Sequence, residues 1–213
     1  MICGVDEAGK GPVIGPMVVA AVSVKNAKMI ENQGFKDSKL LTPQKRKELF
    51  ELIKKNYEYA IEIIEPEEID KYRRKNKLNL LNRKAFEKVI SKLNPNIAYV
   101  DAADVNEERF GREIKSNLTN ENDTDVISMH KADTKIPVVA AASIIAKQTR
   151  ELEIEKLKEE IGDFGSGYPS DTRTIKFLKS YFHDNMKWPS GTRKSWKTVE
   201  RIRPVKKLSD FSD

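Results

Sequence analysis

Residues 2–12 read ICGVDEAGKGP, an apolar run followed at once by two acids and a glycine-lysine-glycine loop. The run Ile2–Val5 predicts a short strand that is buried on both faces. Acids at the end of a strand are typical of a metal site, and a basic glycine-rich loop is typical of a phosphate site. A site that combines the two usually cuts or transfers a phosphodiester.

The rest of the chain predicts an α/β domain with a mixed sheet flanked by helices, because three strands among early helices precede a strand-helix-strand-helix order. Further strands are expected at 17–24, 57–64, 97–100 and 125–129, and helices at 43–55, from Pro66, at 78–93, 106–118 and from Pro137 to Gly162. We predict a catalytic domain over 1–165 and a small helical segment over 166–213, with helices near 171–184 and 192–201. So short a segment makes a weak core of its own, so we expect it to dock on the sheet domain and to contact substrate.

Composition indicates the compartment of the protein and whether it contacts a membrane. The chain has 213 residues and one cysteine, Cys3, which excludes an internal disulfide. No stretch approaches the roughly 20 apolar residues that a membrane span needs, and nothing resembles a signal peptide. We therefore expect a monomer in a reducing cytoplasm, with no membrane contact.

Positive charge is concentrated near the C-terminus. Residues 166–213 hold eleven Lys and Arg against five Asp and Glu, so they carry the whole net charge of +6. Trp188 and Trp196 lie in the same segment. Basic residues interleaved with aromatics are typical of a surface that binds a polyanion, although a solvated helical face has the same composition.

Acids follow three of the predicted strands. Asp6 and Glu7 follow the first, Asp101 follows the strand at 97–100, and Asp133 lies four residues beyond the strand at 125–129. The carboxyl ends of strands are where open α/β sheets place their sites. Two carboxylates about 4 Å apart repel by roughly 4 kcal/mol at an effective dielectric constant near 20. Either some of these acids take up protons or a divalent cation holds them together. Oxygen ligands favour Mg²⁺ or Mn²⁺ over zinc.

Adjacent residues of a pleated strand point to opposite faces of the sheet. Asp6 and Glu7 therefore cannot both face one site within a regular strand. We expect the first strand to end at or between them, a break that the following glycines would allow.

The loop after the acids only partly matches known nucleotide-binding loops. Residues 4–11 nearly fit the triphosphate loop G-x-x-x-x-G-K-[ST], but Gly11 stands where the hydroxyl residue belongs. The spacing of Gly9, Gly11 and Gly15 also fails the dinucleotide pattern. A tight turn remains whose backbone amides, beside Lys10, can approach a sugar or phosphate of a nucleic acid.

Six motifs in this order resemble those of ribonuclease HII, most closely its archaeal form. They are DEAGKGPVIGP at 6–16, DSK at 37–39, VDAADV at 100–105, HKAD at 130–133, AASIIAK at 141–147 and SGYPSD at 166–171. The resemblance implies an RNase H-like fold. It also implies an endonuclease that hydrolyses the RNA strand of RNA–DNA hybrids and cuts 5′ of single ribonucleotides in duplex DNA.

The resemblance also implies roles for particular residues. The metal ligands and catalytic residues would be Asp6, Glu7, Asp101 and Asp133. The loop Gly9-Lys10-Gly11 would recognise the 2′-hydroxyl, which distinguishes RNA from DNA, and Tyr168 would stack on the following sugar. Phosphate contacts would come from Lys39, Ser143, Lys147 and Arg150. The last three fit one helix face by their spacing of four and three.

The implied products are a 3′-hydroxyl and a 5′-phosphate, because water activated by metal attacks the phosphate. This reaction needs no histidine base, so we expect a structural role for His130. Leu208 and Phe211 partly match the peptide Q-x-x-L-x-x-F-F that binds sliding clamps, but Val205 and Ser212 replace two of its residues. A frayed tail explains these residues more simply than a clamp-binding peptide does.

Two other functions stay open from the sequence. One is a hybrid-binding module without catalysis, against which the full set of four acids argues. The other is a metal-dependent DNA nuclease or strand transferase of the same fold, against which the Gly9–Gly11 loop and Tyr168 argue.

Overall fold

A five-stranded mixed sheet forms the centre of the molecule in the computed structural model, which describes residues 1–31, 33–35, 41–119 and 122–203. The strand order is β3-β2-β1-β4-β5, with β1 antiparallel to β2 and parallel to β4. The strands are β1 (Ile2–Ala8), β2 (Met17–Val24), β3 (Glu58–Ile64), β4 (Ile97–Asp101) and β5 (Asp125–Met129). This topology confirms the predicted mixed sheet.

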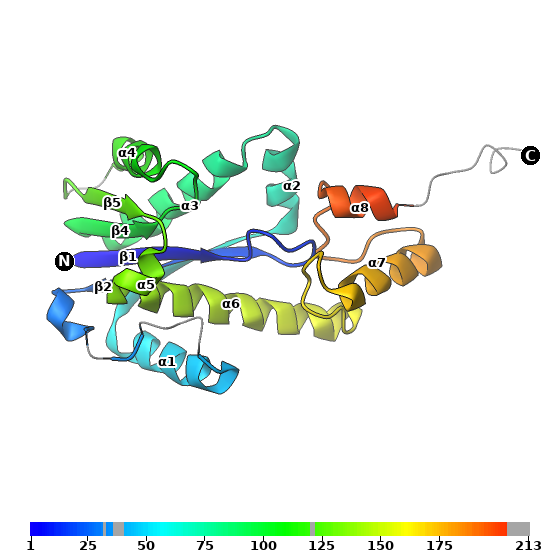
Figure 1. Ribbon diagram of the computed structural model, residues 1–213, viewed down its shortest axis with the longest axis horizontal. Coiled ribbons are helices and arrows are strands. Elements are labelled where there is room, and N and C mark those ends of the chain that lie inside the picture. The colour runs from blue at the N-terminus through cyan, green and yellow to red at the C-terminus, as the bar shows by residue number, and fades with distance from the viewer. Residues whose placement is uncertain (32, 36–40, 120–121, 204–213) are drawn as a thin grey trace, which may run out of the picture.

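Helices cover both faces of the sheet, with α1 and α6 below it and α2, α3 and α4 above it in Figure 1. The helical elements are η1 (Ala27–Met29), α1 (Pro43–Asn56), α2 (Pro66–Arg74), α3 (Leu78–Leu93), α4 (Glu107–Asn117), α5 (Ala132–Lys135), α6 (Pro137–Ile161), α7 (Thr172–Asn185) and α8 (Lys197–Ile202). One apolar core lies between the sheet and α1 and α6, and a second lies between the sheet and α3 and α4. In the described part of the chain, no helix is both long and apolar enough to cross a membrane.

Local signals explain where the main helices begin and end. The Thr42 hydroxyl accepts a hydrogen bond from the Lys45 amide at 3.2 Å and caps α1. Pro137 occupies the first turn of α6, and Gly162, with φ of 93°, ends that helix. The predicted positions of these helices agree with the structure to within a residue or two.

The first half of α6 lies directly on β1. A Cβ atom at Gly4 would stand 2.3 Å from the carbonyl carbon of Val138, so only glycine allows this approach. The helix is rich in alanine where it crosses the sheet, and the residues from Val138 to Ala146 are buried. This close contact fixes the distance between α6 and the carboxyl ends of β1 and β4.

The C-terminal segment is joined to the loop that follows β1. The Val13 amide donates to the Gly167 carbonyl at 2.7 Å, and the Arg193 amide donates to the Val13 carbonyl at 2.8 Å. A third apolar core joins this loop to α6, α7 and α8; it contains Val13, Ile14, Ile154, Phe164, Leu178 and Val199. This core contains residues from both sides of position 165. The domain boundary predicted at that position stays a prediction.

The last helix is shorter than predicted. α8 begins at Lys197, whereas the sequence suggested a helix from about residue 192. Residues 191–193 instead bond to the loop after β1, with Gly15 donating to the Gly191 carbonyl at 2.9 Å. Pairing with that loop replaces the first turns of the expected helix.

Candidate active site

The first strand does not end at its two acids, so that expectation was wrong. β1 continues to Ala8, and its pairing with β2 places Asp6 opposite Ala20 and Glu7 opposite Val19. The neighbouring strand supplies partners for the whole stretch, which overrides the glycines that follow. By strand alternation Asp6 lies on the α6 face of the sheet, and Glu7 lies on the α3 face.

Three aspartates meet at the carboxyl ends of β1 and β4. Carboxylate oxygens of Asp6, Asp101 and Asp133 all lie within 4.8 Å of one another. Asp133 belongs to α5, a single helical turn before α6 where the sequence predicted no helix. The Ala132 amide donates to Oδ1 of Asp101 at 3.1 Å, which holds that turn against β4. Glu7 is outside this group of three, as its place on the other face requires.

Burial makes the acids costly to ionise together. Burial raises the pKa of Asp6 to about 7, and the charge of Asp101 raises it as well, while the Ser143 hydroxyl and Lys147 act in the opposite direction. Burial and then the charge of Asp6 raise the pKa of Glu7 to about 8, against the effect of Lys10. A divalent cation would remove this penalty, and carboxylate oxygens are the ligands that Mg²⁺ and Mn²⁺ prefer. The donor set therefore fits such an ion.

The glycine-lysine-glycine loop leaves β1 beside this cluster. Gly9 has φ of 85°, and a Cβ atom there would stand 2.6 Å from Cδ of Arg150 and 2.7 Å from the Pro16 carbonyl oxygen. A Cβ atom at Gly11 would meet nothing closer than Cε1 of Tyr168 at 3.8 Å. The fold therefore requires glycine at position 9, whereas position 11 is open.

Lys10 ties the loop to the segment after β4. Its ammonium donates to the carbonyl of Ala103, two residues beyond Asp101. A hydrogen bond thus links the loop to the segment that follows Asp101, in addition to the direct continuation of β1 into the loop.

Arg193 holds the loop and was missed as a site residue. Its guanidinium is fully buried and donates to the carbonyls of Gly9 at 2.6 Å, Lys10 at 3.0 Å and Gly15 at 3.0 Å. Burial, and then the nearby charge of Arg150, lower its pKa to about 9. In the sequence, Arg193 is one of the eleven basic residues of 166–213, a set that predicted a surface for a polyanion. No local pattern distinguishes it, since its partners are far away in the chain.

One face of α6 follows the site from the acids to the loop. Ser143 and Lys147 lie near Asp6, as their effects on its pKa indicate, and Arg150 lies against Gly9. The guanidinium carbon of Arg150 is 5.4 Å from the centre of the Tyr168 ring. Tyr168 is 39% exposed, so its ring is accessible to a ligand.

Two predicted residues stand apart from this arrangement. Lys39 lies outside the described residues. His130 is exposed, its ring Nε2 lies 3.2 Å from the Val105 carbonyl oxygen, and its amide donates to the Glu107 carboxylate at 2.6 Å. These contacts join the segments that follow β4 and β5.

A family model of ribonuclease HII matches residues 3–199. The chain belongs to the ribonuclease HII family. It is therefore a ribonuclease H of type 2, an endonuclease that hydrolyses the RNA strand of RNA–DNA hybrids. Ribonuclease HII of Methanoregula boonei is 47% identical over 212 residues, covering 100% of this chain and 99% of that protein. Ribonuclease HII of Thermococcus onnurineus is 48% identical, covering 94% of this chain and 89% of that one.

Solved structures agree with the fold and the family. Ribonuclease HII of Archaeoglobus fulgidus, in a complex with PCNA, matches with a TM-score of 0.87 and 45% identity, over 99% of this chain and 100% of that chain. Ribonuclease H2 of Pyrococcus horikoshii has a TM-score of 0.87 and 43% identity, over 94% of this chain and 96% of that chain. A ribonuclease HIII in complex with Mn²⁺ shares the fold, with a TM-score of 0.78 at 21% identity over 94% of this chain and 68% of that chain.

Proposed function

We propose that this ribonuclease cuts on the 5′ side of single ribonucleotides in duplex DNA, as well as within hybrids, and leaves a 3′-hydroxyl and a 5′-phosphate. The observation that supports this most directly is the link between chemistry and selectivity. The Gly9–Gly11 loop continues the strand that carries Asp6 and Glu7, and Lys10 is bonded to Ala103 beside Asp101. A sugar recognised by the loop would therefore place its phosphate at the acids.

The acids would hold Mg²⁺ or Mn²⁺. Asp6, Asp101 and Asp133 are close enough to share one ion, and Glu7, on the other side of β1, would contact a second ion or its water. Bound ions would supply an activated water and stabilise the leaving oxygen. The chain contributes fixed carboxylates, because β1 and β4 are hydrogen-bonded neighbours and α5 is tied to Asp101.

Selectivity would come from the loop and Tyr168. Backbone amides of Gly9–Gly11 would bond the 2′-hydroxyl, since the open side of Gly11 lets a sugar approach closely. The exposed ring of Tyr168 would stack on the next sugar, where a deoxyribose fits better than a ribose. Lys39 keeps its proposed role as a phosphate contact without structural support, since it lies outside the described residues.

Positive groups on α6 would bind the phosphates that flank the cut. Among the described residues, Nε and Nη2 of Arg150 are buried with no hydrogen-bond partner. A buried guanidinium with free donors suits a phosphate oxygen. Lys147 and Ser143, one and two turns earlier on the same helix face, would contact the phosphate nearer the acids.

Digestion of three labelled duplexes with Mg²⁺ tests the proposal. One is an RNA–DNA hybrid, one is DNA with a single ribonucleotide, and one is DNA throughout. We expect cuts in the first two, with the single cut placed 5′ of the ribonucleotide and a 3′-hydroxyl that a polymerase can extend. Comparable cutting of the all-DNA duplex would favour the DNA nuclease, and tight binding without any cutting would favour the binding module.

A sliding clamp is a proposed partner. The A. fulgidus relative was solved with PCNA, and this chain ends in a partial clamp motif at Leu208 and Phe211, outside the described residues. We expect deletion of 204–213 to abolish binding to the clamp of the same cell without changing the rate of cutting. We also expect the protein to act in the cytoplasm, where a replication clamp would meet it.

A further inference from the structure

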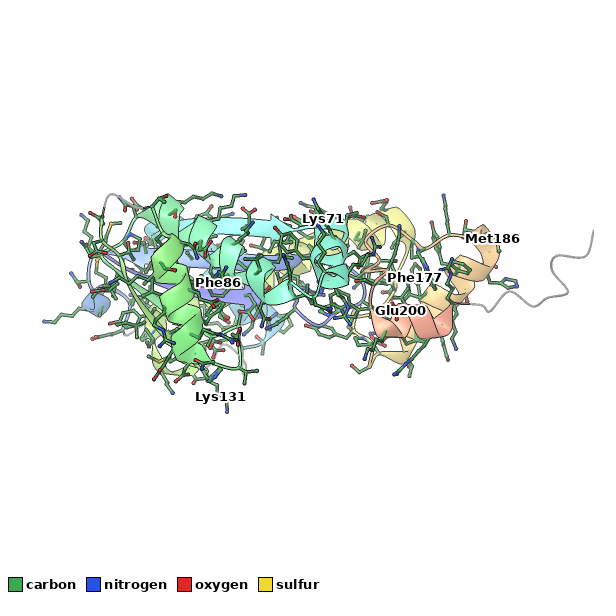
Figure 2. All side chains as sticks on the ribbon, turned by 90° about the horizontal axis from the view of Figure 1, so that it is seen from above. Lys71, Phe86, Lys131, Phe177, Met186 and Glu200 are labelled. Carbon is green, nitrogen blue, oxygen red and sulfur yellow. The ribbon has the colours of Figure 1, made fainter. Side chains whose placement is uncertain are left out.

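A groove runs between the α2–α3 turn and the start of α8, on the α3 side of the sheet. Figure 2 shows the helices that flank it, with Lys71 labelled on α2 and Glu200 on α8. Residues that line it include Arg73, Arg74, Asn76, Lys77, Asn79 and Lys197. A second hollow continues past α8, shares Arg74 and Glu200 with the first, and adds Lys187, Lys194 and Arg203.

The lining is strongly positive. The two hollows together contain seven Lys or Arg residues, and Glu200 is the one acid among the described lining residues. Lys77 and Lys197 are exposed and form no ion pair with another described residue. Asp70 is buried, accepts hydrogen bonds from the amides of Lys194 and Ser195, and lies 3.9 Å from the Arg74 guanidinium. It therefore offsets the charge of Arg74 and leaves the charges of Lys77 and Lys197. A solvated face would mix both signs, so this surface is suited to a polyanion.

The two walls of the groove are held together. Nε of Arg73 donates to the Ser195 carbonyl at 3.0 Å, and its guanidinium lies 4.6 Å from the Trp196 ring centre. Arg193 lies 5.0 Å from the same ring. Trp196 is therefore fixed by two cations, and the start of α8 is fixed relative to α2.

Each wall leads to the active site. On one side, the Asn79 amide donates to Asp104 at 3.0 Å, three residues beyond Asp101. On the other side, the Trp196 indole donates to the Gly11 carbonyl at 3.3 Å. A nucleic acid bound at the loop and the acids would thus lie next to both walls of the groove.

We propose that this groove binds the sugar-phosphate backbone of the duplex at phosphates away from the cut. Arg150, Lys147 and Ser143 lie on the α6 face, so the groove would be a second phosphate site on the opposite side of β1. The inference rests on the proposed function and specifies where the duplex beyond the scissile nucleotide lies. It adds affinity and no chemistry, because no groove residue reaches the acid cluster.

The double variant Lys77→Glu with Lys197→Glu tests the groove. Both residues stand at helix starts, where a negative charge is favourable, so the variant should fold. Binding is measured without added metal, as a function of salt, on a DNA duplex with one ribonucleotide and about two helical turns of DNA on each side. We expect about tenfold weaker binding and a salt slope reduced by about 2, one unit per lost phosphate contact.

The matched control is Lys47→Glu with Lys55→Glu. These exposed residues lie on α1, across the sheet, and give the same change of net charge. A short duplex that covers only the site is a second control, and we expect the groove variant to bind it as the unchanged protein does. Glu200→Gln removes the acid of the groove and should strengthen binding to the long duplex.

Unchanged binding by the groove variant, or an equal loss in the α1 control, would overturn the inference. An equal loss on the short duplex would do so as well, since it would place these residues at the cut itself. The proposed function fails separately, if the unchanged protein does not cut the duplex with one ribonucleotide. At saturating substrate the groove variant should keep the rate of cutting of the unchanged protein.

Discussion

The acid cluster and the glycine loop lie side by side but are held in place by different means. Asp6 and Asp101 lie near the carboxyl ends of two adjacent parallel strands, each one residue beyond the paired residues Val5 and Val100. The loop is held by Arg193, whose partners Gly9 and Gly15 are 184 and 178 residues away in the chain. The acids thus depend on the sheet, and the loop depends on the docking of the C-terminal segment. Chemistry and selectivity should therefore be separable by mutation.

The largest effect is expected at the acids. Asp101→Asn removes a carboxylate from the group of three, and cutting of every substrate should fall by more than about 100-fold, since even outer groups of metal sites contribute that much. Without metal the variant should be at least as stable as the unchanged protein, because repulsion with Asp6 is relieved. The stabilisation that Mg²⁺ gives in thermal unfolding should be lost.

Asp125→Asn is the control for that variant. Asp125 lies at the other end of the sheet, at the start of β5, and is exposed. Its loss should leave cutting unchanged. Substantial cutting by the Asp101 variant would remove the assignment of Asp101 as a metal ligand.

Arg193→Lys tests the other half of the comparison. Lysine keeps a charge but cannot donate to three carbonyls in the geometry of a guanidinium. We expect the free energy of unfolding to fall by about 2–4 kcal/mol, because buried carbonyls lose their donors. Denaturant unfolding measures this loss. The preference for ribonucleotide over deoxyribonucleotide should fall more than the rate on a full hybrid does.

Arg201→Lys is the matched control, since Arg201 is exposed on α8. It should change neither stability nor preference. If Arg193→Lys lowered the rate on all substrates equally, the loop and the acids would act as one unit, and the comparison would be wrong.

The smallest effects separate the two glycines of the loop. Gly9→Ala should destabilise the fold by about 2 kcal/mol or more, because φ is positive and the new methyl would meet Arg150 and Pro16. Gly11→Ala should change the free energy of unfolding by less than about 0.5 kcal/mol, since its side is open. It should still lower the preference for a ribonucleotide, because the methyl would occupy the space that the sugar needs.

Thermal unfolding and competition between ribonucleotide-containing and all-DNA duplexes measure the two properties. Loss of preference in both variants with loss of stability in Gly9→Ala alone is the expected pattern. Full preference in a folded Gly11→Ala protein would contradict the role of the loop in sensing the 2′-hydroxyl.

Most of the elements were predictable because their signals are local. Alternating apolar residues located β3, and a capping threonine before a proline located the start of α1. The end of β1 was not predictable, because pairing with β2 carries the strand through Glu7 despite the loop signals that follow. The separate turn of α5 was missed for a similar reason, since its start depends on Asp101 from another strand.

The candidate site was partly predictable. Acids at strand ends could be seen in the sequence, as could the spacing of Ser143, Lys147 and Arg150 on one helix face. The separation of Glu7 from the three aspartates was not predictable, because it results from β1 continuing through Glu7. The net positive charge of residues 166–213 could be counted in the sequence. Only the structure shows that Arg193 is buried and donates its hydrogen bonds to the glycine loop.

By itself, the sequence determined the residue chemistry of this protein, meaning the acids, the glycine loop, the helix ends and the motifs of its family. Periodicity and spacing reach only over a few residues, and these features lie within that reach. Only the tertiary structure decided which acids meet, which glycine the fold needs, and which arginine holds the loop. Those properties depend on contacts between segments from 31 to 184 residues apart in the chain. There burial and the competition among hydrogen-bond partners, rather than local preference, set the outcome.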